Sequence, residues 1–157
     1  MDYYSVDKIL ADEVKIKIKI KSKIHHFGFF IDDLNNDINE NLSVDIPLYI
    51  SLFFLKNKHC ILCNDILSED FKNDLQANSS IVNLTSVCSY FYNFVSIFYE
   101  QEYVNNIFFN RICKFYTLIM KEKLEEEDIF LMDNIEKNII IRARINYLMY
   151  RMYFIKS

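Results

Sequence analysis

The stretch that decides the fold class is Val14–Ile24, which reads VKIKIKIKSKI. Ile16, Ile18 and Ile20 alternate with lysines along this stretch. Because successive side chains of a β-strand point to opposite faces of a sheet, this period of two predicts a strand with one buried face and one lysine face. The first part of the chain therefore contains a β-sheet.

Shorter elements are predicted after this strand. Phe27–Ile31 (FGFFI) is a second apolar stretch, and its glycine indicates a bend or a close approach of two backbones. The polar segment 32–41 predicts a loop. Ser43–Ile46 is a candidate strand, and Pro47 suits the first turn of a helix over Leu48–Leu55 because proline holds φ near its helical value. This part of the chain therefore forms a small β-rich domain.

The period then becomes helical. His59–Cys63 predicts a short strand, and Ser68 can cap a short helix. In Ser86–Glu100 the polar positions recur every three or four residues, which predicts a helix that is apolar around most of its circumference. Amphipathic helices are then predicted over Val104–Ile119 and Ile129–Phe154.

Together these patterns predict an α+β fold that is mostly α-helical. We expect a small β-rich domain in residues 1–50, a connecting segment with a short helix and a strand in 51–84, and an α-helical domain in 85–157. A chain of 157 residues can bury a core without disulfides or a metal. With 52% hydrophobic residues, one Gly and one Pro, the composition excludes a disordered chain.

Charge and cellular context narrow the function classes. The formal net charge of −4 lacks the broad positive field of a dedicated nucleic-acid-binding protein. Residues 1–7 are acidic and no basic region leads into an apolar stretch, so we expect no secretory signal and an intracellular protein. No window approaches the ~18 apolar residues of a membrane span, so we expect no membrane partner. Inside the cell, four cysteines are expected to be reduced thiols: Cys60, Cys63, Cys88 and Cys113.

Catalytic and metal-binding motifs are weak. Cys60 and Cys63 have the spacing of half a zinc site, and His59, His25 and His26 could be imagined as further ligands. A structural zinc site normally brings a second close pair, whereas Cys88 and Cys113 stand alone in helical patterns. A metal-dependent small enzyme on these residues is an alternative. The sequence favours no metal, no cofactor, no small-molecule substrate and no enzyme activity, since it shows no nucleophile motif and no Gly-rich phosphate loop.

The lysine row of Lys15–Lys23 supports a second alternative, a small nucleic-acid-binding module. Alternate lysines of one strand stand ~6.6 Å apart, close to a phosphate repeat. Lysines also keep exposed edge strands from pairing with other chains, and this explanation is the stronger one from sequence alone. DNA contact is therefore expected to be at most indirect or weak.

Two helical segments predict a protein interface. The apolar Ser86–Glu100 helix needs cover on most sides, and the last helix is too long for one small domain to cover, so partner chains are the economical answer. On the last helix, Lys137, Arg144 and Arg151 recur every seven residues and form a basic stripe beside the apolar face. The candidate interface residues are Tyr90, Phe91, Phe94, Phe98, Met132, Ile135, Ile139, Arg144 and Tyr147.

Several segments resemble, in the same order, the GINS family of eukaryotic DNA replication. YYSVDKIL at 3–10 is similar to the family's amino-terminal Tyr-Tyr-x-Ile-Asp-x-Ile-Leu signature, and FGFF at 27–30 is similar to its Leu-Gly-Tyr-Leu. VDIPLYI at 44–50 resembles Val-Glu-Leu-Pro-Leu-Trp-Leu, with tyrosine in place of tryptophan. Further along the chain, IVNL at 81–84 before the aromatic YFYNF at 90–94, and MDNIEK at 132–137, resemble later family segments. The tyrosine-rich start and the aromatic segment favour the third Psf subunit over the second, which remains an alternative.

The resemblance implies a small β-rich domain followed by an α-helical domain, of the types called B and A in this family. It implies a noncatalytic scaffold subunit of a nuclear heterotetramer with three sibling subunits. Through that complex the partners would be the MCM ATPase hexamer and the Cdc-forty-five protein, in the replicative helicase that initiates and extends DNA replication.

Overall fold

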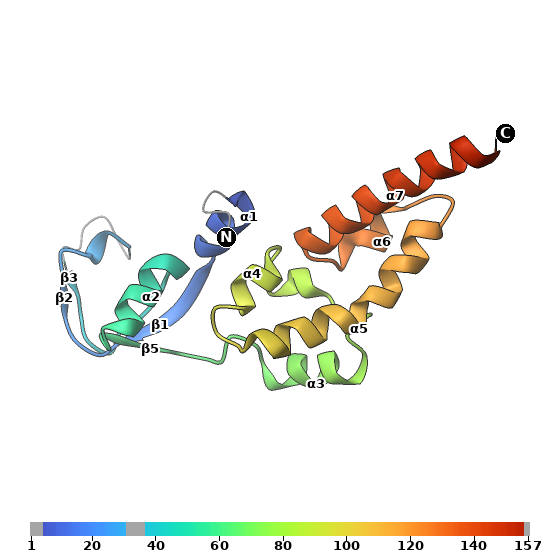
Figure 1. The fold of residues 1–157 in the computed structure, drawn as a ribbon. Helices are drawn as coiled ribbons and strands as arrows, with labels where there is room; N and C mark the ends of the chain where they lie inside the picture. The colour runs from blue at the N-terminus through green and yellow to red at the C-terminus, as the bar shows by residue number, and fades with distance from the viewer. Residues whose placement is uncertain (1–4, 31–36, 156–157) are drawn as a thin grey trace. The chain divides into compact units, whose positions relative to one another are not determined.

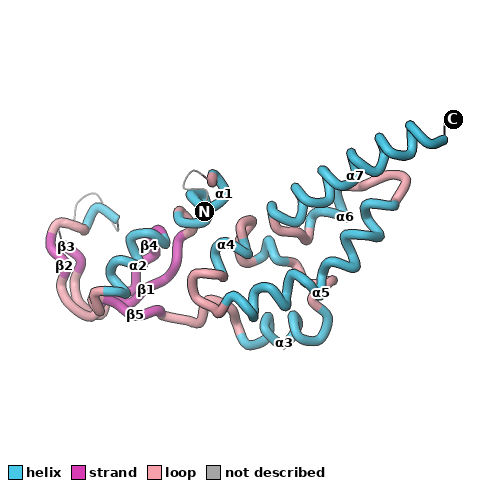
Figure 2. The backbone as a smooth tube through the Cα atoms, viewed as in Figure 1, coloured by secondary structure: helices cyan, strands magenta, loops and turns pink. Residues whose placement is uncertain are grey.

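The fold is described from a computed structural model, in which residues 5–30 and 37–155 are described. The chain divides into two compact units, Met1–Ser68 and Glu69–Ser157. In the described residues the strands belong to the first unit, and the second unit is helical (Figures 1 and 2). The expected α+β class, mostly helical, agrees with this arrangement.

The first unit is built on a three-stranded antiparallel sheet. Its strands are β1 (Lys15–Ile20), β4 (Ser43–Pro47) and β5 (Cys60–Leu62), in the order β4-β1-β5. The three isoleucines of β1 are buried and its lysines are exposed, which confirms the predicted period of two. The long strand β1 is therefore the centre of the sheet and hydrogen-bonds to a neighbour on each side.

Helices pack with this sheet. Helix α2 (Leu48–Lys56) begins after Pro47 as predicted and contacts all three strands. Its buried Ser51 hydroxyl donates to the carbonyls of Ile46 and Pro47, both at 3.1 Å, so the helix start and the end of β4 are tied together. Helix α1 (Val6–Asp12) was not predicted; it packs against α2.

The predicted strand Val14–Ile24 is divided in two. After a bend, β2 (Ile24–His25) pairs with β3 (Asp37–Ile38) in a separate two-stranded sheet. The expected apolar stretch Phe27–Ile31 contains a single 3₁₀ turn, η1 (Gly28–Phe30). Ile31, the first half of the predicted loop 32–41 and the two tyrosines of the amino-terminal signature lie outside the described residues.

The second unit consists of helices. They are α3 (Glu69–Asn78), the 3₁₀ turn η2 (Leu84–Ser86), α4 (Phe91–Val95), α5 (Gln101–Met120), α6 (Glu126–Phe130) and α7 (Asn134–Ile155). Helices α5 and α7 pack together, and α6 lies between them in the chain. Their shared core contains Phe115, Leu118, Met132 and Ile140.

The predicted helix Ser86–Glu100 is wrong, because only Phe91–Val95 is α-helical there. Polar groups compete locally with helix formation: the Asn83 side chain accepts a hydrogen bond from the Thr85 amide, and the Ser86 hydroxyl donates to the Asn83 carbonyl at 2.7 Å. The apolar side chains of this segment therefore belong to a series of turns around a short helix. Similarly, the predicted helix Ile129–Phe154 is two helices, α6 and α7.

The observed units differ from the predicted boundaries. The expected connecting segment 51–84 is divided at Ser68. Its part of α2 and all of β5 belong to the first unit, and α3 belongs to the second. The physical reason is that β5 hydrogen-bonds to β1, with Ile18 opposite Leu62 and Ile20 opposite Cys60. A strand that completes the sheet cannot be part of a linker.

Candidate interaction surface on helix α7

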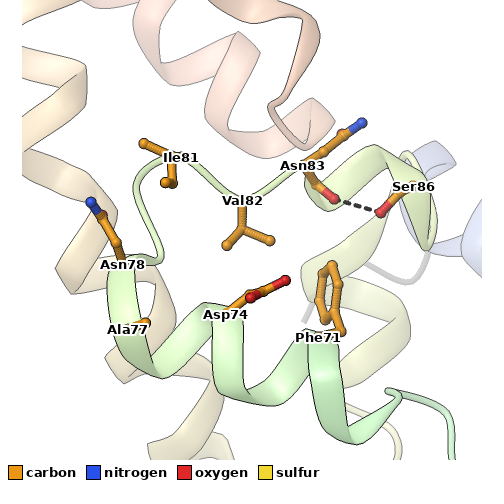
Figure 3. A pocket seen from close by; sticks show the side chains of 8 residues that line it. All are labelled: Phe71, Asp74, Ala77, Asn78, Ile81, Val82, Asn83 and Ser86. Carbon is orange, nitrogen blue, oxygen red and sulfur yellow. Dashed lines mark hydrogen bonds between the residues drawn. The ribbon is translucent and has the colours of Figure 1, made fainter.

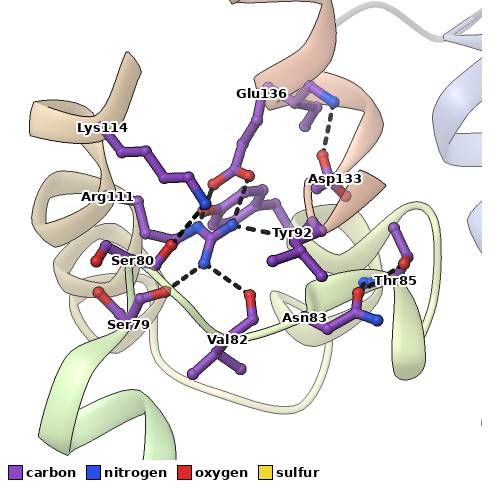
Figure 4. Close-up of polar contacts among 12 residues, drawn as sticks. Ser79, Ser80, Val82, Asn83, Thr85, Tyr92, Arg111, Lys114, Asp133 and Glu136 are labelled. Carbon is purple, nitrogen blue, oxygen red and sulfur yellow. Dashed lines mark hydrogen bonds and ion pairs between the residues drawn. The ribbon is translucent and has the colours of Figure 1, made fainter. Parts of the chain in front are cut away.

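A buried ion pair fixes how α7 lies against α5. The Arg111 guanidinium of α5 donates two hydrogen bonds to the Glu136 carboxylate of α7, from Nε to Oε1 at 2.6 Å and from Nη2 to Oε2 at 3.0 Å (Figure 4). Both side chains are 0% exposed. Bidentate geometry of this kind constrains both the distance and the orientation of the two groups. The pair therefore sets the register between the two helices.

Neighbouring groups complete the hydrogen bonds of this pair. Arg111 also donates to the carbonyls of Ser79 and Val82, in the segment that leads into η2. The Tyr92 hydroxyl of α4 donates to Glu136 Oε1 at 2.6 Å. Burial, and then the Glu136 charge, hold the pKa of Tyr92 well above its ordinary value, so its hydroxyl stays a donor. Three helices and one loop thus meet at one charged centre.

The start of α7 is fixed by Asp133. Its Oδ1 accepts a hydrogen bond from the Ile135 amide at 2.6 Å, as a capping residue does. The side chain is 0% exposed, and burial raises its pKa to about 6. A second buried acid, close in sequence to Glu136, therefore holds the same end of the helix.

Further along α7, Arg144 caps the end of α5. Its guanidinium donates to the carbonyls of Leu118 (3.1 Å), Lys121 (2.5 Å) and Glu122 (2.6 Å). The last carbonyls of a helix have no partner within the helix, so a cation there supplies both hydrogen bonds and favourable charge. Since Arg111 meets Glu136 and Leu118 meets Arg144, the two helices run parallel.

This register leaves the C-terminal part of α7 beyond the end of α5. Residues 145–154, which we call the α7 overhang, follow Arg144 and rise about 15 Å along the helix axis. Figure 1 shows α7 continuing past α5. The large apolar side chains of the overhang are exposed, up to 76% at Tyr153; they are Ile145, Leu148, Met149, Tyr150, Met152, Tyr153 and Phe154.

One continuous stripe of exposed apolar side chains begins just before the overhang and extends along it. Ile141, Ile145, Leu148 and Met152 follow one another at spacings of four, three and four, which places them on one face of a helix, and they are between 42% and 60% exposed. The buried contacts of α7 with α5 use a different face, which includes Ile140 and Glu136. Helix α7 therefore has two apolar faces, of which one is used inside this unit.

Part of the predicted interface is instead core. Phe91 (0% exposed), Phe94 (4%) and Met132 (0%) are buried within the chain. Phe91 lies against Phe71, with ring centroids 6.1 Å apart, and Met132 belongs to the core shared by α5 and α7. The expectation that these side chains are available to partners is corrected, because the turns of 84–100 bring them together with the unit's own helices.

The other predicted residues lie between core and surface. Tyr90, Phe98, Ile135 and Tyr147 are half-buried, and Ile139 is 38% exposed. Arg144 is half-buried and committed to the end of α5. Met132 thus lies in the core just before α7, Ile135 lies half-buried in its first turn, and Ile139 and Tyr147 lie nearer the surface.

Sequence reasoning missed the exposed stripe and the buried ion pair. The stripe had a signal, since the 4-3-4 spacing from Ile141 to Met152 is visible in the sequence. The ion pair had no signal, because Arg111 and Glu136 lie in different helices and are 25 residues apart in the sequence. Only the tertiary packing distinguishes which apolar face is internal.

An open pocket of about 430 Å³ lies between α3 and the segment before η2 (Figure 3). Its lining includes Phe71, Asp74, Ile81 and Asn83. Asp74 supplies a carboxylate and Ser86 a hydroxyl to this lining, and the Ser86 hydroxyl donates to the Asn83 carbonyl at 2.7 Å.

The cysteines of the zinc alternative lie in and beside β5. Cys60 is buried, which raises the pKa of its thiol, and the Cys63 thiol donates to the Ser43 hydroxyl at 3.6 Å. Among the described residues no group of three His, Cys, Asp or Glu side chains could hold a metal ion. None of the described helices has the length and apolar character needed to cross a membrane.

Comparison with known proteins gives the class of the chain. Residues 4–54, which cover the larger part of the first unit, match the family model described as PSF3 N-terminal domain. The chain is thus similar to GINS subunits of DNA replication. More particularly, it is similar to the DNA replication complex GINS protein psf3 of Aspergillus fumigatus, at 26% identity over 116 residues. The match covers 67% of this chain and 65% of the relative, and it confirms the resemblance to the third Psf subunit.

Proposed function

We propose that this chain is the third Psf-type subunit of a GINS heterotetramer, acting as a noncatalytic scaffold in the nucleus. In that complex it helps to join the MCM hexamer and the Cdc-forty-five protein in the replicative helicase. The family model and the fungal relative both carry the name of the third subunit, which favours it over the second. A scaffold subunit needs protein contacts and no catalytic site of its own.

The observation that carries the scaffold function is the α7 overhang. The overhang exposes apolar side chains along about 15 Å of helix, and contiguous exposed apolar surfaces mark protein interfaces. Tyrosine, phenylalanine and methionine, which are enriched at interfaces, make up most of its second half. The occupants we propose are helices of the sibling subunits.

The interface centre proposed on this basis is the stripe Ile141–Met152. Ile139 and Tyr147 stay in the proposed interface as residues beside the stripe. Lys137 and Arg151 are rim charges in this arrangement, and such charges mainly affect partner choice and association rate. Arg144 contributes indirectly, because its cap on α5 holds the helix that carries the overhang.

Co-expression with the three sibling subunits tests the proposal. The double substitution Ile145→Asp/Leu148→Asp places charges in the stripe and is expected to abolish co-purification of the chain with its siblings. The matched control is Ile81→Asp, which places the same charge at an isoleucine of the second unit that is 67% exposed, and it should co-purify normally. Normal assembly of the double variant would show that the overhang is not the interface.

A further inference from the structure

The first unit carries a row of lysines that the proposed interface does not use. Lys15, Lys17 and Lys19 lie on the exposed face of β1, and exposed Lys21 follows directly after the strand. The opposite face of β1 is buried, with α2 in contact with the strand. The sheet therefore has one face for the core and one basic face.

The structure removes the simplest explanation of this row. Lysines often protect an edge strand, but β1 is the central strand, bonded to β4 on one side and β5 on the other. Its backbone groups are already paired, so the lysines are not needed to prevent pairing with another chain. Neighbouring like charges repel, so a row of lysines on a central strand has an energetic cost that edge protection does not explain.

The charges of the row are also available. Within the described part of the chain, Lys15, Lys17, Lys19 and Lys21 make no ion pair. Lys23 differs, because its Nζ lies 2.8 Å from Asp37 Oδ2 in the small second sheet. On the three-stranded sheet, the acid that faces the row is Asp45, opposite Lys17.

We propose that this face, which we call the β1 lysine face (Lys15, Lys17, Lys19 and Lys21), binds the phosphate backbone of single-stranded nucleic acid. The partner class rests on the proposed function, which places the chain at replicating DNA. Alternate residues of a strand are about 6.7 Å apart, so the four lysines present a regular row of cations along which the flexible phosphate backbone of a single strand can lie. Residues opposite the row include Pro47, Ser43 and Ile61 but no aromatic ring for base stacking, so the contact is electrostatic and independent of sequence.

The test measures the salt dependence of binding. A fluorescently labelled oligo(dT) of about 20 nucleotides is titrated with the full-length chain over a range of KCl concentrations, with anisotropy as the readout. Each lysine that neutralises a phosphate of a single strand contributes about 0.7 to the slope of log K against log salt. Lys17→Gln/Lys19→Gln should therefore lower the slope by about 1.4. The control Lys8→Gln/Lys123→Gln removes two exposed charges elsewhere and should leave it unchanged.

Three results would overturn the proposal: no binding of the oligonucleotide by the wild-type chain, equal loss of slope in both variants, or equally effective competition by polyglutamate at the same charge concentration. The last result would assign the face to an acidic protein segment. Co-purification of Lys17→Gln/Lys19→Gln with the sibling subunits separates this proposal from the proposed function. If the wild-type chain assembles normally but binds no oligonucleotide, the scaffold function stays in place and only the nucleic-acid contact is removed.

Discussion

Arg111 and Glu136 show how much one pair of side chains decides in the second unit. Both are fully buried, and the guanidinium also reaches the carbonyls that lead into η2. Removal of one partner of a buried ion pair strongly destabilises the folded protein, because the other charge stays buried without compensation. The stability of the second unit should therefore fall more when Arg111 or Glu136 is replaced alone than when both are replaced together.

We expect Arg111→Met to lower the free energy of unfolding by about 3–5 kcal/mol, because it leaves the Glu136 carboxylate buried without its cation. The double variant Arg111→Met/Glu136→Met should be more stable than either single variant. Lys121→Met is the control, since it breaks the exposed contact with Asp128 and should change the free energy of unfolding far less than Arg111→Met does. Urea denaturation measures all four; a loss of similar size in the control would contradict the prediction.

Asp133 gives a pH dependence. Burial raises its pKa to about 6 in the folded chain, against an ordinary value of 3.8, so the folded state binds the proton more tightly than the unfolded state. Its contribution to stability is fully present below about pH 4 and is lost as the pH rises through about 6. Asp133→Asn should therefore gain about 2–3 kcal/mol relative to wild type between pH 4 and pH 7. Exposed Asp70→Asn should show no such gain when unfolding is measured across the same pH range.

At the scale of the element, the cap that α7 places on α5 is the main unusual feature. Helix ends are normally capped by nearby residues, whereas Arg144 is 24 residues beyond Met120, at the end of α5. The cap makes the end of one helix depend on the docking of another. Fraying of α5 and release of α7 are therefore linked.

Arg144→Met should expose this link. We expect a loss of about 1–2 kcal/mol in the free energy of unfolding, together with faster hydrogen exchange of the amides near the end of α5, because three carbonyls lose a charged donor. Arg142→Met, at an exposed position of the same helix, should stay within about 0.5 kcal/mol of wild type. Unchanged exchange at residues 118–122 in the Arg144 variant would show that the cap is not functional.

Elements were predictable where periodicity and burial agree. The lysine–isoleucine alternation identified β1, and Pro47 marked the start of α2, because both signals are local. The prediction for 86–100 was wrong because apolar residues at helical spacing predict one helix, whereas the side chains of Asn83 and Ser86 favour turns. The proposed interface lies on the helix that the sequence indicated, but several of the predicted residues are internal, because the face that packs inside the unit is set by the distant residue Arg111.

For the whole molecule, the exposed stripe and overhang predict behaviour in solution. We expect the chain alone to self-associate, because Ile145, Leu148 and Met152 present apolar surface that no described residue covers. Ile145→Lys/Leu148→Lys/Met152→Lys should stay monomeric at concentrations at which the wild type forms larger species. Light scattering measures the difference; a wild-type chain that stays monomeric at high concentration would contradict the prediction.

The parallel arrangement of α5 and α7 also has a mechanical consequence. Helix α7 is attached to α5 at two levels, through Glu136 and through Arg144, and its free end points the same way as the end of α5. A pull on the overhang along the axis of α7 therefore loads both attachments in shear at the same time, instead of peeling them apart one after the other. Resistance to such a force is governed by the barrier to unfolding and not by the equilibrium stability alone. A subunit that transmits force between moving partners would gain from this geometry, and Arg144→Met should lower the rupture force more than its effect on equilibrium stability indicates.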